Sequence, residues 1–170
     1  MMIRTETSAD YDGVYQVNVK AFDDREDEAR LVESIRNSEG FIPELSIVAE
    51  KDNEIVGHIL LSKAVVQDGE NTNDVIVLAP IAVMPNVQKQ GIGKALILEG
   101  LDRCRTLGYD LVFLIGHPEY YPKFGFQPAR QHGFELKQFE VSDNVFMVCE
   151  LKEGALQKVK GELIYPKSFF

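Results

Sequence analysis

The chain has 170 residues, a length typical of one domain, and 45% of them are hydrophobic, which is enough for a full core. We therefore expect a single domain over residues 1–170, with a core over about 1–151 and a C-terminal arm over 152–170. Eighteen Lys and Arg residues stand against 27 Asp and Glu residues, which gives a formal net charge of −9. This charge argues against a nucleic acid or an anionic membrane as partner, since both need a basic face.

The first residues, Met1–Glu6, hold no apolar stretch of the kind found in secretory signals. The longest uncharged run, Val75–Gln88, has 14 residues and is too short to span a bilayer. Cys104 and Cys149 both sit in apolar patterns, so we expect small core residues and no disulfide. With three histidines and no Cys/His cluster, no metal site is expected. We therefore expect a reduced, cytoplasmic protein.

In chain order, a short strand at Met1–Glu6 precedes a helix that Ser8 can cap and that carries apolar residues at helical spacing. A second helix is predicted over Glu26–Asn37, with acidic residues in its first turn and Arg36 in its last, as the helix dipole favours. The pattern then changes to three strands, over Leu45–Glu50, Glu54–Val66 and, after a polar loop at Gln67–Asn73, Asp74–Val83.

A long helix over about Gln90–Leu107 follows and is closed by Gly108. Leu111–Ile115 is a continuous apolar run, typical of a buried strand beside a helical crossover, which implies a parallel pair with a right-handed connection. A short helix near Glu119–Lys123 and strand-like segments around Gly133–Phe139 and Asn144–Leu151 complete the pattern. This order predicts an α/β fold with a mixed central sheet flanked by helices. It is not a plain Rossmann array, because three consecutive strands have no helices between them.

The most informative stretch joins the strand Asp74–Val83 to the long helix and reads Gln88-Lys89-Gln90-Gly91-Ile92-Gly93-Lys94. Glycine lets a ligand approach the backbone, and the free N–H groups at a helix start favour anions such as phosphate. A Walker A loop is excluded, since Gln88 stands at its first glycine and Ala95 at its Ser or Thr. The dinucleotide fingerprint fails at Leu96, where its third glycine would stand. The pattern Gln/Arg-x-x-Gly-x-Gly/Ala is matched in full, although from these residues alone a purely structural pair of glycines is an equal alternative.

At these residues the chain resembles the GNAT superfamily of acetyl-coenzyme A-dependent N-acetyltransferases, whose order of elements it follows over about residues 1–150. A second motif ends like the family's core, in Tyr-x-x-x-Gly-Phe, and is similar to the YhbS-like branch: His117-Pro118-Glu119-Tyr120-Tyr121-Pro122-Lys123-Phe124-Gly125-Phe126. The resemblance implies that the strands Asp74–Val83 and Leu111–Ile115 splay at their ends into a V-shaped slot for acetyl-CoA.

The same resemblance implies how acetyl-CoA would be held. Its pantetheine arm would pair with the backbone of Ile81, Ala82 and Val83, as an added strand does. Its pyrophosphate would rest on the loop, which makes the other expected cofactor-binding residues Gln88, Lys89, Gln90, Gly91, Ile92, Gly93 and Lys94. Lys89 and Lys94 are equally well interpreted as solvated helix lysines.

In the family, the tyrosine four residues before the Gly of Gly-Phe commonly protonates the leaving sulfur. That residue is Tyr121 here, with Tyr120 or a purely structural aromatic residue as alternatives. A backbone N–H near Val83 is the candidate oxyanion donor. Many relatives also place a glutamate on the strand before the glycine loop, where this chain reads Val75-Ile76-Val77-Leu78-Ala79. This departure favours a water relay as general base, with His58 and His117 as the other candidates.

The leading hypothesis is an N-acetyltransferase that moves an acetyl group from acetyl-CoA to a primary amine of a small molecule or peptide by direct attack. The alternative is a catalytically weak acetyl-CoA-binding sensor or partner-docking module of the same fold. We interpret the acidic residues of 23–28 primarily as a solvated helix start. The alternative interpretation is a surface that attracts an ammonium acceptor. The apolar residues after Leu151 predict an arm that packs on the same domain or across a homodimer.

Overall fold

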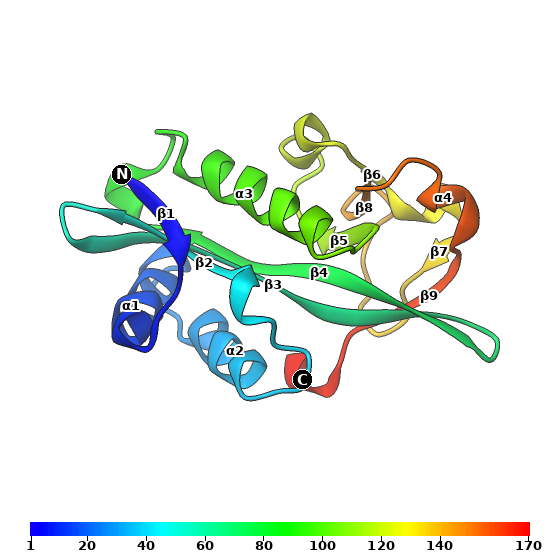
Figure 1. Ribbon diagram of the computed structural model, residues 1–170, viewed down its shortest axis with the longest axis horizontal. Coiled ribbons are helices and arrows are strands. Elements are labelled where there is room, and N and C mark those ends of the chain that lie inside the picture. The colour runs from blue at the N-terminus through cyan, green and yellow to red at the C-terminus, as the bar shows by residue number, and fades with distance from the viewer. The chain divides into compact units, whose positions relative to one another are not determined.

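The computed structural model describes all 170 residues of the chain (Figure 1). They form two compact units. Unit 1 comprises Met1–Ser62, Leu78–Arg103 and Ser168–Phe170, and unit 2 comprises Lys63–Val77 and Cys104–Lys167. The single-domain expectation stays a prediction. None of the helices combines the length and the apolar character that a membrane span requires.

The sheet of unit 1 is built on an antiparallel ladder. β1 (Met2–Thr5) pairs with β2 (Ser46–Lys51), and β2 pairs with β3 (Glu54–Asp68). Asp52 and Asn53 form the tight turn between β2 and β3, with φ angles of 53° and 64°. Asp and Asn tolerate this left-handed conformation better than other residues with a Cβ, which explains why this turn signal was readable in the sequence.

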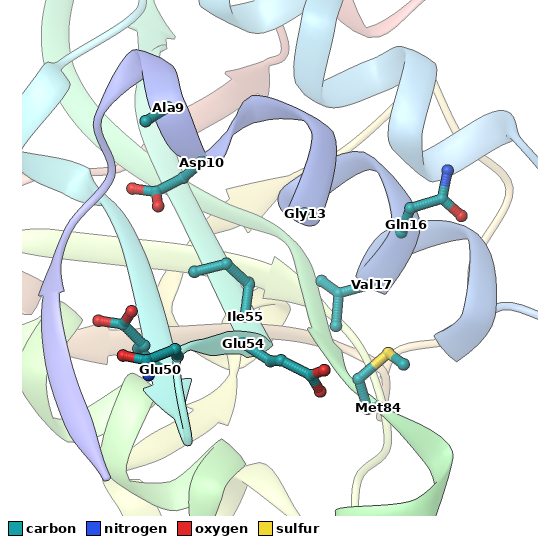
Figure 2. A pocket seen from close by; sticks show the side chains of 10 residues that line it. Ala9, Asp10, Gly13, Gln16, Val17, Glu50, Glu54, Ile55 and Met84 are labelled. Carbon is teal, nitrogen blue, oxygen red and sulfur yellow. The ribbon is translucent and has the colours of Figure 1, made fainter.

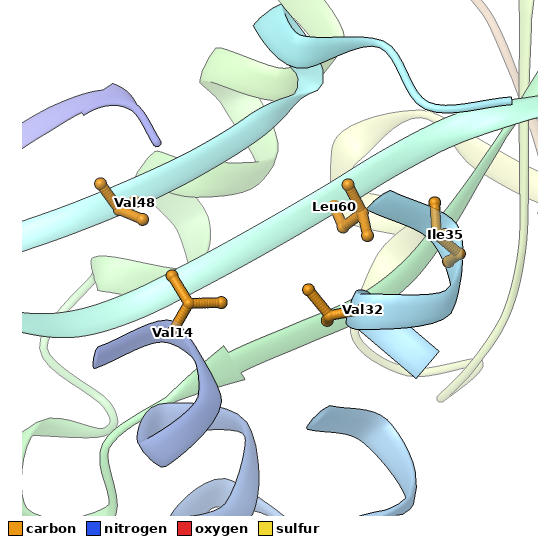
Figure 3. Packing of buried hydrophobic residues seen from close by; sticks show 5 residues of the cluster. All are labelled: Val14, Val32, Ile35, Val48 and Leu60. Carbon is orange, nitrogen blue, oxygen red and sulfur yellow. The ribbon is translucent and has the colours of Figure 1, made fainter. Parts of the chain in front are cut away.

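One face of this sheet is covered by α1 (Tyr11–Ala21) and α2 (Asp27–Arg36). Figure 3 shows the resulting core, in which five side chains from the helices and the sheet converge: Val14, Val32, Ile35, Val48 and Leu60. All five are at most 2% exposed, and Phe169 from the C-terminal end packs against them. Full burial of such a side chain contributes roughly 1.5–3 kcal/mol to folding, so this cluster anchors both helices.

The long helix α3 (Ile92–Thr106), whose residues 92–103 lie in unit 1, packs there against the opposite face of residues 54–62 of β3, where glycines permit a close approach. A Cβ at Gly57 would lie 3.0 Å from side-chain atoms of Ile92 and Leu96. A Cβ at Gly100 would lie 2.8 Å from Leu61 Cδ1. Larger residues would push the helix off the strand, so these glycines fix the start of α3 and with it the preceding loop.

Unit 2 holds the parallel pair that the sequence predicts. β4 (Asn71–Val83), whose residues 71–77 lie in this unit, runs parallel to β5 (Leu111–Ile115). β5 is also antiparallel to β8 (Phe146–Glu150), which in turn is antiparallel to β6 (Phe126–Pro128). The sheet is therefore mixed, as expected. Its core is aromatic, since the Phe113 ring contacts Phe134 edge-on and stacks on Phe146.

The C-terminal arm adds one more strand to unit 2. After α4 (Ala155–Lys158), β9 (Gly161–Ile164) pairs antiparallel with the end of β3 and parallel with β7 (Phe134–Glu135). Tyr165, which follows β9, is 4% exposed. The apolar residues that marked this segment in the sequence are thus used in packing.

The segment Gln67–Asn73, expected to be a polar loop, is mostly strand. β3 continues to Asp68 and β4 begins at Asn71, with Gly69 at a φ of 61° in the turn between them. Residues 67–74 are all exposed, so this hairpin end projects into solvent. Without a buried face, it carries no hydrophobic alternation for sequence analysis to detect.

The segment Gly133–Phe139 contains only the two-residue strand β7, and the rest of the expected strand is a loop. Cys104 and Cys149 are free and buried, as predicted. Burial raises the pKa of the Cys104 thiol to about 12 and that of Cys149 to about 11, so both stay protonated at neutral pH.

Candidate active site

The predicted glycine loop runs from β4 through a short 3-10 turn at Pro85–Val87 to the start of α3. Residues 88–91 are all exposed. Lys89 and Gly91 adopt left-handed φ angles of 63° and 88°. A Cβ at Gly91 would meet no atom within 4 Å, so the backbone lies open to solvent there. A ligand can therefore touch the chain directly at Gly91.

The start of α3 supplies backbone donors without helical partners. Ala95 N donates to Gly91 O at 3.0 Å, so the N–H groups of the three preceding residues lie ahead of the helical bonding pattern. Ile92 is 3% exposed and turns its side chain toward Gly57 of β3. Lys94 is exposed. Together with the dipole of this 15-residue helix, the arrangement suits an anion such as a pyrophosphate.

The end of β4 is oriented by two hydrogen bonds. Met84 N donates to Val56 O of β3 at 2.8 Å. Because neighbouring residues in a strand point their N–H groups to opposite edges, the N–H and C=O of Val83 face away from β3. The Val83 carbonyl accepts Gln88 Nε2 at 3.1 Å, so the Gln88 side chain ties the loop back to the strand. Gln88 is therefore committed to closing the loop, which the sequence pattern alone did not reveal.

Tyr121 begins a 3-10 turn over Tyr121–Phe124 and is 9% exposed. Its ring lies against Gly116: a Cβ there would be 2.5 Å from Tyr121 Cε2. Phe126 contacts the same ring edge-on, with centroids 5.8 Å apart. Burial, with a smaller contribution from Tyr120, raises the pKa of Tyr121 to about 12. The phenol is thus a protonated donor at neutral pH, held in a fixed orientation.

Tyr120 is the less enclosed of the two tyrosines. Its ring contacts Tyr121 edge-on at 5.1 Å between centroids, and Lys123 Nζ lies 4.3 Å from its centre. Burial raises its pKa as well. The cation over its face occupies the position that a cationic substrate would take. This arrangement favours a packing role for Tyr120 beside Tyr121.

The turn before Tyr121 borders a cavity of about 530 Å³, lined by His117, Pro118, Glu119 and Tyr120. The N–H groups of Tyr120 and Tyr121 both point to His117 O, at 3.3 and 3.4 Å, which closes the turn. The His117 side chain is exposed, so it stays a candidate general base. Gly116, for which the sequence predicted no role, lies directly before this turn and contacts the Tyr121 ring.

His58 is not a general base for substrate. Its side chain is 0% exposed and both ring nitrogens are occupied, Nδ1 by Asn18 Nδ2 at 3.2 Å and Nε2 by Ser46 Oγ at 3.0 Å. Ser46 donates its one hydroxyl proton to Glu6 Oε2 at 2.8 Å, so His58 must donate from Nε2 and accept at Nδ1. Burial and, second, the charge of Arg36 lower the pKa of His58 to about 3. It is a buried neutral histidine, and this candidate for the base is wrong.

The acidic residues of 23–28 are largely paired within their own segment. Asp24 pairs with Lys20 at 3.2 Å, Glu26 with Arg30 at 2.8 Å, and Glu28 with Arg25 at 3.4 Å. Such exposed pairs contribute little to stability, because water and salt screen their charges. They agree with a solvated helix start, and attraction of an ammonium acceptor stays a prediction.

A second cavity, of about 370 Å³, lies in unit 1 between α1 and the turn joining β2 to β3 (Figure 2). Asp10 and Glu50 line it, and both are paired with Arg4, at 2.7 and 3.1 Å. The Arg4 guanidinium lowers the pKa of Asp10 to about 2. These two carboxylates thus share one guanidinium, which balances one of their two negative charges.

The comparison with known families agrees with this geometry. The model described as the acetyltransferase (GNAT) family matches residues 11–126, which include the glycine loop and end at Phe126. The chain belongs to the GNAT acetyltransferase family. The mixed sheet that contains the parallel pair β4 and β5 is the GNAT fold, and GNAT proteins of this kind are acetyl-CoA-dependent N-acetyltransferases.

Three relatives are informative for this GNAT chain. YjhQ of Escherichia coli, named an uncharacterized N-acetyltransferase, is 37% identical over 121 residues, 71% of this chain and 66% of YjhQ. YhbS of the same organism, named likewise, is 31% identical over 99% of this chain and 98% of its own length. A crystal structure of YhbS with CoA has a TM-score of 0.90 and covers 99% of this chain and 91% of that one.

A GNAT acetyltransferase of Brucella melitensis, solved with acetyl-CoA, is 28% identical with a TM-score of 0.80. The match covers 99% of this chain and 97% of that one. The resemblance inferred from the two motifs is therefore confirmed, as is the fold class. The individual site residues stay predictions.

Proposed function

We propose that this GNAT enzyme transfers the acetyl group of acetyl-CoA to a primary amine of a small molecule or peptide, by direct attack and with Tyr121 as the acid. The observation that carries the proposal is the open backbone at Gly91 ahead of α3. There an exposed backbone, the start of a 15-residue helix and two lysines coincide in an acidic chain.

Acetyl-CoA fits the residues present. The N–H groups from Gln88 to Lys94 would hold its pyrophosphate, with Lys89 and Lys94 adding charge. Its pantetheine would pair with the backbone of Ile81, Ala82 and Val83. In support, β4 continues six residues past Val77, whereas β5 continues only two residues past its partner Phe113. The last residues of β4 thus have no counterpart in the shorter strand β5, which suits a V-shaped slot.

When bound, acetyl-CoA supplies an activated acetyl group as a thioester. The neutral amine of the acceptor attacks the thioester carbonyl carbon, so a C–N bond forms and the C–S bond breaks. The Val83 N–H, which faces away from β3, stabilises the negative charge on the carbonyl oxygen. Tyr121 donates its phenolic proton to the departing sulfur, which leaves as a thiol. The surplus proton of the amine passes to water, and the phenolate recovers a proton from solvent.

With His58 buried and no glutamate on β4, a water relay is the base that fits best, and exposed His117 is the alternative. The alternative function, a catalytically weak acetyl-CoA sensor or docking module, draws support from the missing strand glutamate. The enclosed, protonated Tyr121 argues against it, because a sensor has no need of an acid.

Calorimetry with acetyl-CoA and with desulfo-CoA, followed by thiol release from acetyl-CoA in the presence of spermidine, L-lysine or an alanine-initiated peptide, tests the proposal. Mass spectrometry should detect one added acetyl group on at least one amine. Tight cofactor binding without acetylation of any amine would favour the sensor.

A further inference from the structure

The loop between β7 and β8, residues 136–145, is anchored in its first half by buried Leu136 and by Gln138 and Phe139, both of which contact Tyr165. In its second half no residue is fully buried, and Ser142, Asp143 and Asn144 are exposed. A loop with few buried contacts holds one conformation only if polar ties impose it. Two of the ties of its second half, to Val141 and to Asp143, come from a single side chain, Arg130.

Arg130 lies in a 3-10 turn at Ala129–His132, and its side chain is 22% exposed. Its Nη1 donates to Val141 O and to Asp143 Oδ1, both at 2.9 Å. Its Nε donates to Glu135 Oε1 at 2.9 Å, on the β7 side. The planar guanidinium thus bridges β7 to the second half of the loop, a geometry that lysine cannot reproduce with one ammonium group.

From Val141 the path to the active-site turn is short. Val145 N donates to Ser142 O at 3.3 Å and closes a turn over residues 142–145. Val145 O accepts the N–H of Gly116 at 2.9 Å. Gly116 is the residue on which the Tyr121 ring rests. Each step is a direct contact within unit 2.

We propose that Arg130 is a positioning residue for acetyl transfer. It holds Val141 and Asp143 and thereby fixes the turn over residues 142–145. The Val145 carbonyl at the end of this turn holds the N–H of Gly116. The Tyr121 hydroxyl then points in one direction without paying conformational entropy during the reaction. This inference rests on the proposed role of Tyr121. A misplacement of a reacting group by about 1 Å can cost roughly 100-fold in rate, so a loosened turn should be visible in kcat.

The test compares Arg130→Lys with Arg103→Lys as matched control. Arg103 also binds several oxygens, of Glu99, Thr5 and Glu44, but all of them belong to unit 1. Asp143→Ala is a milder variant, because its side chain is 81% exposed and its loss should leave the fold intact. Thiol release from acetyl-CoA with the best of the three probe amines gives kcat, calorimetry gives the CoA dissociation constant, and melting gives stability.

For Arg130→Lys we expect kcat to fall by about 10-fold or more while CoA affinity stays within about two-fold. Asp143→Ala should show a smaller loss and Arg103→Lys none. In the Tyr121→Phe background, Arg130→Lys should have no further effect on kcat, because the group that it positions is gone. Losses that multiply in the double variant would overturn the inference, as would an unchanged kcat in Arg130→Lys. An unchanged kcat in Tyr121→Phe alone would instead overturn the assignment of the acid in the proposed function.

Discussion

Gly116 and Tyr121 are in such close contact that no residue other than glycine fits beneath the ring, since a Cβ at Gly116 would lie 2.5 Å from Tyr121 Cε2. A second contact, 3.3 Å from Leu114 Cδ1, limits movement on the other side. The two residues are separated by only four others, and the turn between them is closed by the His117 carbonyl. The orientation of Tyr121 is thus set locally, by the backbone of the motif that carries it.

Gly116→Ala should therefore impair the reaction without touching the hydroxyl. The added methyl displaces the Tyr121 ring, and we expect kcat to fall by about 10-fold or more with CoA affinity retained. Steady-state kinetics and calorimetry of the variant measure both. A normal kcat would mean that the turn relaxes freely, or that the ring position does not matter for the rate.

Gly93→Val should weaken cofactor binding. Its methyl groups would stand over the N–H groups proposed for the pyrophosphate, whereas the helix itself tolerates valine at a modest cost of about 0.7 kcal/mol or less in propensity relative to alanine. We expect a higher dissociation constant for CoA by calorimetry, with an unchanged circular dichroism spectrum. Equal affinity would show that the phosphates bind elsewhere.

His58 predicts a pH dependence of stability. Its pKa is lowered from the ordinary 6.5 to about 3 in the fold, so the unfolded chain binds a proton between these values and the folded chain does not. The stability that neutral His58 contributes is fully present above pH 6.5 and is lost as the pH falls toward 3. At pH 5 the loss in the free energy of unfolding amounts to about 2 kcal/mol. Urea unfolding at pH 7.5 and 5 measures the loss, and His58→Gln should reduce the difference. An identical difference in the variant would assign it to the carboxylates instead.

The C-terminal pair Phe169 and Phe170 offers a matched test of the arm. Phe169 packs on the core cluster of unit 1, whereas Phe170 is 70% exposed. Phe169→Ala should lower the free energy of unfolding by about 1–3 kcal/mol, and Phe170→Ala much less. Equal effects would contradict the packing of the arm.

Sedimentation of the full chain and of a chain ending at Leu151 tests the homodimer expectation, which stays open.

Local signals were readable from the sequence. Gly91 could be identified because it belongs to a glycine pattern at a helix start, where a ligand can approach the backbone, and Tyr121 because its spacing to Gly125-Phe126 is a motif. The features that could not be predicted depend on contacts between residues that are distant in the chain. His58 looks like any polar residue of an alternating strand, and its burial depends on Asn18 and Ser46, distant in the chain. Arg130 reveals its role only through Val141 and Asp143, which no periodicity connects to it. The hairpin end at residues 67–73 was missed because both its faces are solvated.

The central claim is that Tyr121 protonates the departing thiolate of CoA, and the most direct measurement is kcat of Tyr121→Phe beside Tyr120→Phe. The substitution removes one proton donor and keeps the ring on Gly116, so CoA affinity and melting temperature should change little. The account predicts that kcat of Tyr121→Phe falls by roughly 10²–10⁴, the usual contribution of a positioned acid, while Tyr120→Phe stays near wild type. A Tyr121→Phe enzyme that turns over within about two-fold of wild type, or a loss confined to Tyr120→Phe, would contradict it.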